Sequence, residues 1–214
     1  MNTKRIFFWL AFIIVLVLII LGLIAAQNKS PSGGPGSPAP VTAADHVRGP
    51  ATAPVTMIEY GDFQCPACGQ YYPIVERLYD ESSSSLRMVF RHFPLPQHLN
   101  APLAAQASEA AAIQGKFWEM YNQLYTTQAQ WSDIADPHSV FIGYATKLGL
   151  DPVKFKSDID ASSTQAIVNA DQTEGQQIGI NATPTFFLNG KAIVNPQSYD
   201  EFKADIQKAA QSAK

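Results

Sequence analysis

The stretch Phe63-Gln64-Cys65-Pro66-Ala67-Cys68 decides how this sequence folds, because it places both cysteines of the chain at one boundary between a strand and a helix. The preceding run, Val55–Tyr60, is rich in β-branched and aromatic residues and predicts a strand. Proline after Cys65 suits the first position of a helix, and apolar residues continue at helical spacing to about Asp80. We therefore predict a strand, a turn over residues 61–64 and a helix that starts beside Cys65.

The elements on either side extend this unit to the order β-α-β, a block of helices, then β-β-α. A second strand covers Leu86–Phe93 and ends at Pro94. The pattern predicts helices over 100–114, 117–125, 137–148, 152–159 and 164–178, with Asn100 capping the first of them. Asn189-Gly190 predicts a type I′ hairpin between strands 185–188 and 191–194, and an amphipathic helix over 199–211 closes the domain.

The composition describes a folded domain with additional segments. The chain has 214 residues, of which 46% are hydrophobic and 15% charged, which excludes wholesale disorder. Three of the 15 basic residues and none of the 18 acidic ones lie in residues 1–44, so the remainder carries a formal charge of −6. An acidic body without a basic stripe argues against a nucleic-acid partner.

Residues 6–26 predict a transmembrane signal anchor. The run is 21 residues long, uncharged and nearly all apolar, which is enough to cross a bilayer. Lys4 and Arg5 precede it, so residues 1–5 are expected in the cytoplasm and the rest of the chain outside, on a single-pass cell-membrane protein. A cleaved signal peptide is the alternative, but its apolar region would be shorter, and residues 23–26 are a poor cleavage site.

A linker is predicted between the anchor and the folded domain. Ten of the eleven residues from Ser30 to Pro40 are Ser, Pro or Gly, a composition that cannot bury apolar surface. We therefore assign residues 27–44 to a linker and 45–214 to one domain, with a helical insertion at about 98–163.

Four interpretations of the Cys65–Cys68 pair compete. A structural disulfide would close a very small loop and so constrain the unfolded chain little. A zinc site needs four ligands, and the sequence has no second cysteine pair and no closely spaced histidine pair; His92 and His98 are separated by two prolines. Copper(I) binding is no better supported. A redox-active dithiol remains the favoured interpretation.

Local physics supports this redox interpretation. At a helix N-terminus, Cys65 lies beside unpaired N–H groups and the positive end of the helix dipole, which stabilise a thiolate. Cys68 lies one turn further in and is expected to be covered. Cys65 is therefore predicted to exchange with substrates, and Cys68 to resolve the mixed disulfide. Histidines His92 and His98 are expected in surface or packing roles.

Several motifs resemble the DsbA-like group of thioredoxin-fold thiol–disulfide oxidoreductases. The cysteine motif is followed by Ala182–Gly190, which reads ATPTFFLNG before the predicted hairpin. Asp45–Gly49, Phe90–Leu95 and Gln114–Trp118 also resemble that group, so the likeness covers nearly all of residues 45–214. It implies an α/β thioredoxin fold with a helical insertion, preceded here by the anchor.

The resemblance also implies roles for particular residues. Thr183-Pro184 corresponds to a cis-proline dipeptide facing the Cys65 sulfur, with Pro66, Ala67 and Thr183 contacting substrate. Glu59, six residues before Cys65, corresponds to a buried acid that shuttles protons. Ala67 replaces a histidine that helps to stabilise the thiolate in the best-known members, which argues against a very strongly oxidising potential.

These inferences predict an extracytoplasmic dithiol oxidase. It would donate its Cys65–Cys68 disulfide to reduced secreted or periplasmic polypeptides and be re-oxidised by a DsbB- or VKOR-like membrane protein. We expect a monomer that needs no metal and no cofactor beyond the dithiol itself. A disulfide reductase or isomerase on the same fold is the first alternative, and a tethered peptide-binding chaperone is the second.

Overall fold

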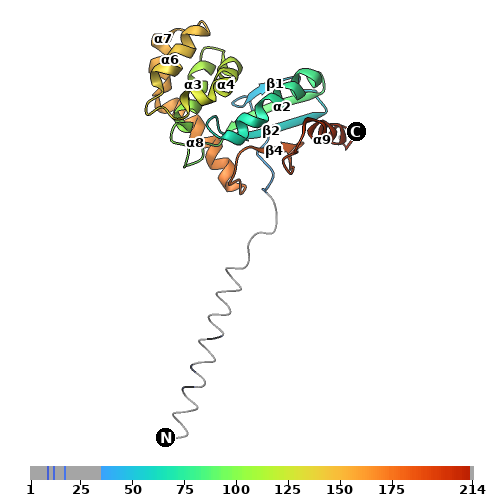
Figure 1. The fold of residues 1–214 in the computed structure, drawn as a ribbon. Coiled ribbons are helices and arrows are strands. Elements are labelled where there is room, and N and C mark those ends of the chain that lie inside the picture. The colour runs from blue at the N-terminus through green and yellow to red at the C-terminus, as the bar shows by residue number, and fades with distance from the viewer. Residues whose placement is uncertain (1–8, 10–11, 13–16, 18–34, 213–214) are drawn as a thin grey trace. The chain divides into compact units, whose positions relative to one another are not determined.

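The computed structural model describes residues 9, 12, 17 and 35–212 (Figure 1). Residues 35–212 belong to one compact unit, and residues 1–34 to a separate one. The predicted cytoplasmic residues 1–5, nearly all of the anchor and residues 27–34 of the linker therefore lie outside the description. Among the described residues, no helix is long and apolar enough to span a bilayer.

A five-stranded mixed sheet forms the centre of the domain, in the order β1-β3-β2-β4-β5. β2 and β3 are parallel, and the other neighbouring pairs are antiparallel. The strands are β1 (His46–Arg48), β2 (Val55–Gly61), β3 (Leu86–His92), β4 (Thr185–Leu188) and β5 (Lys191–Ala192). The predicted order of elements is confirmed, with β1 as an additional edge strand.

Eight described helices surround this sheet, and most of them lie between β3 and β4. In Figure 1, α3, α4, α6 and α7 gather at one side of the sheet, and α9 lies at the other. The helices are α2 (Pro66–Ser82), α3 (Ala101–Ala112), α4 (Phe117–Thr126), α5 (Gln128–Trp131), α6 (His138–Lys147), α7 (Pro152–Ile159), α8 (Ser162–Gln177) and α9 (Tyr199–Ser212).

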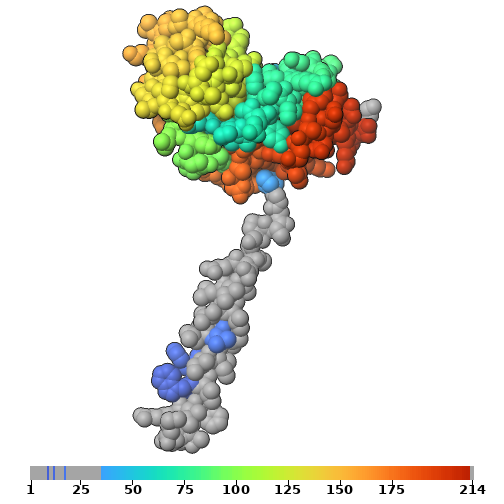
Figure 2. All heavy atoms as spheres, viewed as in Figure 1, coloured from blue at the N-terminus to red at the C-terminus, as the bar shows by residue number. Residues whose placement is uncertain are grey.

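Helices α2 and α9 cover one face of the sheet. Val75 and Leu78 of α2, and Phe202 and Ile206 of α9, share a buried core with Met57 of β2. In the space-filling view, α2 forms a band between the helices of the insertion and α9 (Figure 2). The N-terminus of α2, which carries the cysteines, is thereby held between the sheet and the insertion.

The opposite face of the sheet is covered by α8 and the residues after it. Tyr60, Phe93, Phe187 and Ile178 belong to a second, smaller core there. Gly175 of α8 lies so close to the sheet that a Cβ at this position would stand 2.7 Å from the Phe93 ring. A glycine is therefore required where α8 crosses the strands.

Alternation along β2 places Glu59 on the same face as α2. Val55 and Met57 point into the core shared with α2, and Glu59 is the next residue in that series. Gly61 completes it: a Cβ there would lie 2.3 Å from the ring of Phe90 and 3.2 Å from Glu59 Oε1. The strand therefore brings a carboxyl group beneath the active-site helix.

The segment predicted as a linker packs on the domain in the part that the structure describes. Gly36 N–H donates to the carbonyl of Ile178, at 2.7 Å, and Ser37 Oγ donates to the carbonyl of Gly190, at 2.9 Å. Further along, Arg91 Nη2 donates to the carbonyl of Ala39, at 3.1 Å. Residues 36–39 are thus tied to the domain by hydrogen bonds.

Local chemistry accounts for two further outcomes. Asn189 and Gly190 both have positive φ, 49° and 78°, which confirms a type I′ turn. Asn100 occupies the N-cap position of α3, as predicted, but its side chain makes no capping hydrogen bond to the helix. Its Nδ2 instead donates to the carbonyls of Trp131, Ser132 and Ile134, which bind the loop after α5.

Candidate active site

Cys65 and Cys68 lie at the start of α2, directly after β2. Cys65 is the N-cap residue, with φ −66° and ψ 122°, and Pro66 occupies the first turn. Both are free cysteines, 3.9 Å apart. Cys65 is 6% exposed and Cys68 0%, so Cys68 is covered as predicted.

The two thiols differ strongly in acidity. Hydrogen bonds from the Cys68 side chain, Thr183 and the backbone N–H groups of Cys68 and Ala67 outweigh the effect of burial and lower the pKa of Cys65 to about 5. Burial raises the pKa of Cys68 well above its ordinary value, assisted by its hydrogen bond to Cys65 and the charge of Glu59. At neutral pH, Cys65 is therefore a thiolate and Cys68 a thiol that donates to it.

The loop before β4 faces the Cys65 sulfur. The Thr183–Pro184 peptide bond is cis, as the resemblance implied. Cys65 Sγ lies 3.4 Å from the carbonyl oxygen of Thr183. Pro66 is exposed and Ala67 half-buried, so these residues border the sulfur from the helix side. The geometry brings together the residues that were expected to contact substrate.

Glu59 is buried, as the resemblance implied. It is 2% exposed, and its Oε2 has no hydrogen-bond partner among the described residues. Burial raises the pKa of Glu59 to about 8, against a smaller lowering by the positive charge of Arg48. Glu59 is therefore a buried carboxyl group that is mostly protonated at pH 7, and its ionised form would raise the pKa of Cys68.

Residues of the insertion also position the active-site turn. Gln128 Nε2 donates to the carbonyls of Phe63, at 2.7 Å, and Cys65, at 2.9 Å. Gln64 Nε2 donates to the carbonyl of Ser132, at 2.8 Å. No sequence pattern pointed to Gln128, because a single glutamine in a helix of four residues has no periodicity.

The histidines form separate contacts. His98 lies against Asp62, a residue that the sequence analysis did not single out. His92 and His46 both contact Oε1 of Glu109, at 2.7 and 2.5 Å, and the three side chains could each offer one ligand atom to a metal ion. However, His92 Nδ1 has no partner among the described residues, whereas a metal-bound imidazole usually donates its second N–H. Hydrogen bonds between the two imidazoles and Glu109 therefore account for this group better than a metal site does.

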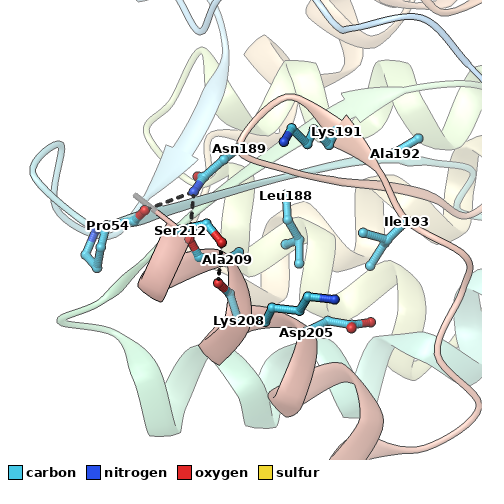
Figure 3. Close-up of a pocket in the computed structure, with 10 residues that line it drawn as sticks. All are labelled: Pro54, Leu188, Asn189, Lys191, Ala192, Ile193, Asp205, Lys208, Ala209 and Ser212. Atoms are coloured by element: carbon cyan, nitrogen blue, oxygen red, sulfur yellow. Dashed lines mark hydrogen bonds between the residues drawn. The ribbon is translucent and has the colours of Figure 1, made fainter. Parts of the chain in front are cut away.

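A cavity of about 620 Å³ lies away from the cysteines, between the β4–β5 hairpin and α9 (Figure 3). Leu188, Ala192 and Lys208 are among the residues that line it. Asn189 spans its edge, with Nδ2 donating to the carbonyl of Pro54 at 3.1 Å. Neither cysteine lines this cavity, so the reactive site is the surface around Cys65.

Taken together, these features define a class of protein. A dithiol at the N-terminus of a helix, after a central strand and opposite a cis-proline loop, is the site of a thioredoxin-fold redox protein. A family model described as Thioredoxin matches residues 41–208. The chain belongs to the thioredoxin family.

Solved structures place the domain among DsbA-type folds. BdbD from Bacillus subtilis, in its oxidised form, is 26% identical, with a TM-score of 0.74 over 84% of this chain and 100% of that one. The α-DsbA1 of Wolbachia pipientis is 21% identical, with a TM-score of 0.72 over 81% of this chain and 94% of that one. The domain therefore has a DsbA-like thiol–disulfide oxidoreductase fold with its helical insertion.

Curated relatives carry a similar segment inside much longer proteins. The Na(+)/H(+) antiporter NhaA 1 of Mycolicibacterium gilvum is 41% identical over 152 residues, which is 69% of this chain and 24% of that protein. The Na(+)/H(+) antiporter NhaA 1 of Salinispora arenicola is 44% identical over 149 residues, 69% of this chain and 22% of that protein. The chain thus spans about a quarter of the length of the relatives it matches.

Proposed function

We propose that this domain is a thiol–disulfide oxidoreductase that donates its Cys65–Cys68 disulfide to reduced polypeptides outside the cytoplasm. The observation that carries the proposal is the difference in acidity between the two thiols. A group that stabilises the Cys65 thiolate stabilises the reduced protein, because the disulfide has no charge to stabilise. Transfer of the disulfide to a substrate is therefore thermodynamically favourable, because it produces the stabilised reduced protein.

The reaction proceeds in two exchanges. A substrate thiolate attacks Cys65 Sγ, the Cys65–Cys68 bond breaks, and Cys68 leaves as a thiolate. A second substrate thiolate then attacks the substrate sulfur of the mixed disulfide, and Cys65 leaves. The substrate loses two electrons and the protein gains them. The low pKa of Cys65 makes it the better leaving group in the second exchange.

Glu59 is proposed to supply the proton that Cys68 needs. The raised pKa of Cys68 makes its thiolate unstable, so the sulfur takes up a proton when it leaves. Glu59, with a pKa of about 8, is mostly protonated at pH 7 and lies on the same face of the sheet. Water must return the proton to Glu59 afterwards. Glu59 is therefore assigned a proton-transfer role, and Cys65 and Cys68 the redox roles.

The magnitude of the effect supports electron flow from substrate to this protein. Relative to an ordinary thiol, a pKa of about 5 stabilises the reduced protein at pH 7 by ~3 kcal/mol. For two electrons this corresponds to ~60 mV, which raises a thioredoxin-like potential of about −270 mV to roughly −210 mV. Such a protein oxidises most substrate dithiols. The hydrogen bonds to Cys65 thus favour an oxidase over a reductase.

The proposed setting is the outer side of the cell membrane. Residues 6–26 have the composition of a single-pass anchor, and the relatives named as Na(+)/H(+) antiporters carry a similar domain within a transport protein. Oxidised substrates also accumulate outside the reducing cytoplasm. A DsbB- or VKOR-like membrane protein would accept the two electrons. We propose a monomer that needs no metal or organic cofactor and has no nucleic-acid partner.

Equilibration with glutathione tests the proposal. The reduced and oxidised fractions of the full chain, separated after acid quenching and alkylation, should place the couple above about −220 mV. A value near or below about −270 mV would identify a reductase instead. The variant with serine at both Cys65 and Cys68 is the control: full activity of that variant in cells would identify a peptide-binding chaperone.

A further inference from the structure

Asp62 occupies the turn between β2 and α2, three residues before Cys65, and its side chain is fully buried. Its Oδ1 accepts the backbone N–H groups of Gln64, at 2.7 Å, and Cys65, at 3.2 Å. Its Oδ2 accepts the backbone N–H of Leu95, at 2.9 Å, and lies 2.6 Å from Nδ1 of His98. One carboxylate therefore connects the active-site turn to the loop between β3 and α3.

The geometry of this turn controls the surroundings of the Cys65 sulfur. Cys65 adopts the extended N-cap conformation, which places its sulfur at the N-terminal end of α2, where the N–H groups of Ala67 and Cys68 lower the pKa of the thiol. No side chain makes a capping hydrogen bond to α2, so the first N–H groups of the helix are left to act electrostatically on a negative charge at the sulfur. Asp62 holds the backbone N–H groups of Gln64 and of the cap residue Cys65. It acts on the sulfur through the backbone and does not touch it.

His98 completes the connection from the other side. Pro94 and Pro96 restrict the loop that presents the Leu95 N–H, and His98 follows in the turn that leads into α3. Among the described residues, His98 is the one basic side chain within ion-pair distance of Asp62. A buried carboxylate without such partners is strongly destabilised, so His98 is needed to keep Asp62 in this position.

We propose that Asp62 and His98 form a positioning pair for the reactive cysteine, in which His98 holds the buried carboxylate and the carboxylate holds the turn that presents the Cys65 sulfur. This inference rests on the proposed function and names residues that tune its reactive thiol. The pair is a separate device from Glu59, which lies on the strand beneath Cys68.

Two effects of the pair on Cys65 have opposite signs, which makes the proposal testable. The negative charge of Asp62 opposes a second negative charge at Cys65, so loss of the charge alone would lower the pKa of that thiol. Loss of the turn geometry would remove N–H groups from the sulfur and raise its pKa. The positioning role predicts that the second effect is larger.

The test uses His98, which is partly exposed, so that its replacement need not unfold the protein. His98→Ala removes the contact with Asp62. His98→Asn keeps a nitrogen donor at a similar place, because the amide nitrogen of asparagine, like Nδ1 of histidine, is bonded to Cγ. Asp62→Ala removes the carboxylate, and with it the hydrogen bonds to the active-site turn and the contact with His98. His138→Ala is the matched control, because His138 also pairs with carboxylates, Asp136 and Asp160, but at an exposed position on α6.

The readouts are the thiolate absorbance of the reduced protein as a function of pH and the equilibrium constant with glutathione. His98→Ala and Asp62→Ala should move the Cys65 titration upward by about one pH unit and change the equilibrium constant about tenfold toward the oxidised protein. His98→Asn should restore most of both shifts, and His138→Ala should produce neither.

An unchanged or lowered Cys65 titration in both His98→Ala and Asp62→Ala would overturn the positioning role. A failure of the proposed function would look different. It would show as a wild-type potential in the reductase range or as no exchange with substrate, while the titration would still report on the pair. If Asp62→Ala does not fold, His98→Ala and its asparagine counterpart decide the question.

Discussion

Gly69 of α2 and Gln128 of α5 lie so close together that no side chain fits between them: a Cβ on Gly69 would stand 2.5 Å from Oε1 of Gln128. The amide nitrogen of the same glutamine donates to the carbonyls of Phe63 and Cys65. α5 belongs to the helical insertion. The insertion therefore reaches the active-site turn through one side chain, and a glycine in the catalytic helix leaves room for it.

Substitutions at this contact should slow disulfide exchange. Gln128→Ala removes two hydrogen bonds to the turn, and Gly69→Ala displaces the amide that makes them. At ~1 kcal/mol per hydrogen bond, the loss of both bonds corresponds to ~2 kcal/mol, so we expect about a 25-fold loss of the exchange rate in each variant. Because both changes disrupt one contact, the double variant should lose little more than either single one. Gln130→Ala, exposed on the same helix, is the control, and an equal loss there would contradict the prediction.

The two cysteines should give different phenotypes when each is replaced by serine. Cys68→Ser should accumulate mixed disulfides on Cys65, because the internal thiol that reverses them is gone. Cys65→Ser should form none, since Cys68 is 0% exposed. Non-reducing gels after alkylation measure the adducts. Comparable amounts in the two variants would contradict the assignment of roles.

Glu59→Gln should stabilise the protein in a pH-dependent manner. The folded-state pKa of about 8 lies above the unfolded value of 4.5, so the native protein is most stable with Glu59 protonated and loses stability as pH rises from 4.5 through 8. Glutamine avoids this loss. Denaturant unfolding should therefore show the variant ~3 kcal/mol more stable at pH 7 and equal to wild type near pH 4.

The same measurement has a matched control in Glu119→Gln. Glu119 is half-exposed and pairs with Lys116, which holds the pKa of its carboxyl below the ordinary value. Its replacement should give no stabilisation at neutral pH. A gain at Glu59 that does not vanish in acid would show that packing, and not ionisation, is responsible.

The reduction potential should change slope with pH near 5. Above that value, reduction of the disulfide takes up two electrons and one proton, because Cys65 remains a thiolate and Cys68 is protonated. The potential should then fall by about 30 mV per pH unit. Below pH 5 both sulfurs are protonated, and the slope should approach about 59 mV. A single slope of the larger value down to pH 4 and up to pH 8 would show that Cys65 has an ordinary pKa.

Much of the fold follows from local patterns in the sequence. Short stretches whose residues strongly favour one local structure predicted the β2–α2 unit and the hairpin at Asn189-Gly190, and both are confirmed. β1 was missed because three residues, His46–Arg48, are too few to show alternation. β5 is shorter than predicted, because only Lys191 and Ala192 pair with β4.

Some residues of the active site could also be predicted from the sequence, and others could not. Cys65 and Cys68 could be predicted from their motif at a boundary between strand and helix, whereas Thr183-Pro184 and the buried Glu59 were predicted from the resemblance to the DsbA-like group. The contacts of Asn100 could not be predicted, since its amide bonds carbonyls more than thirty residues away, and no local rule favours those over a helix cap. The contacts of Asp62 and Gln128 likewise join segments far apart in the chain, so they emerge only from the folded structure.

If the proposed membrane anchor is correct, the hydrogen bonds that tie residues 36–39 to the domain would limit the distance between the domain and the bilayer. Only the nine residues 27–35 would then remain between residue 26 and the first hydrogen bond, at Gly36. A fully extended chain of that length covers at most ~32 Å. The Cys65 site would then stay near the membrane surface, within reach of the proposed membrane re-oxidant in the same bilayer.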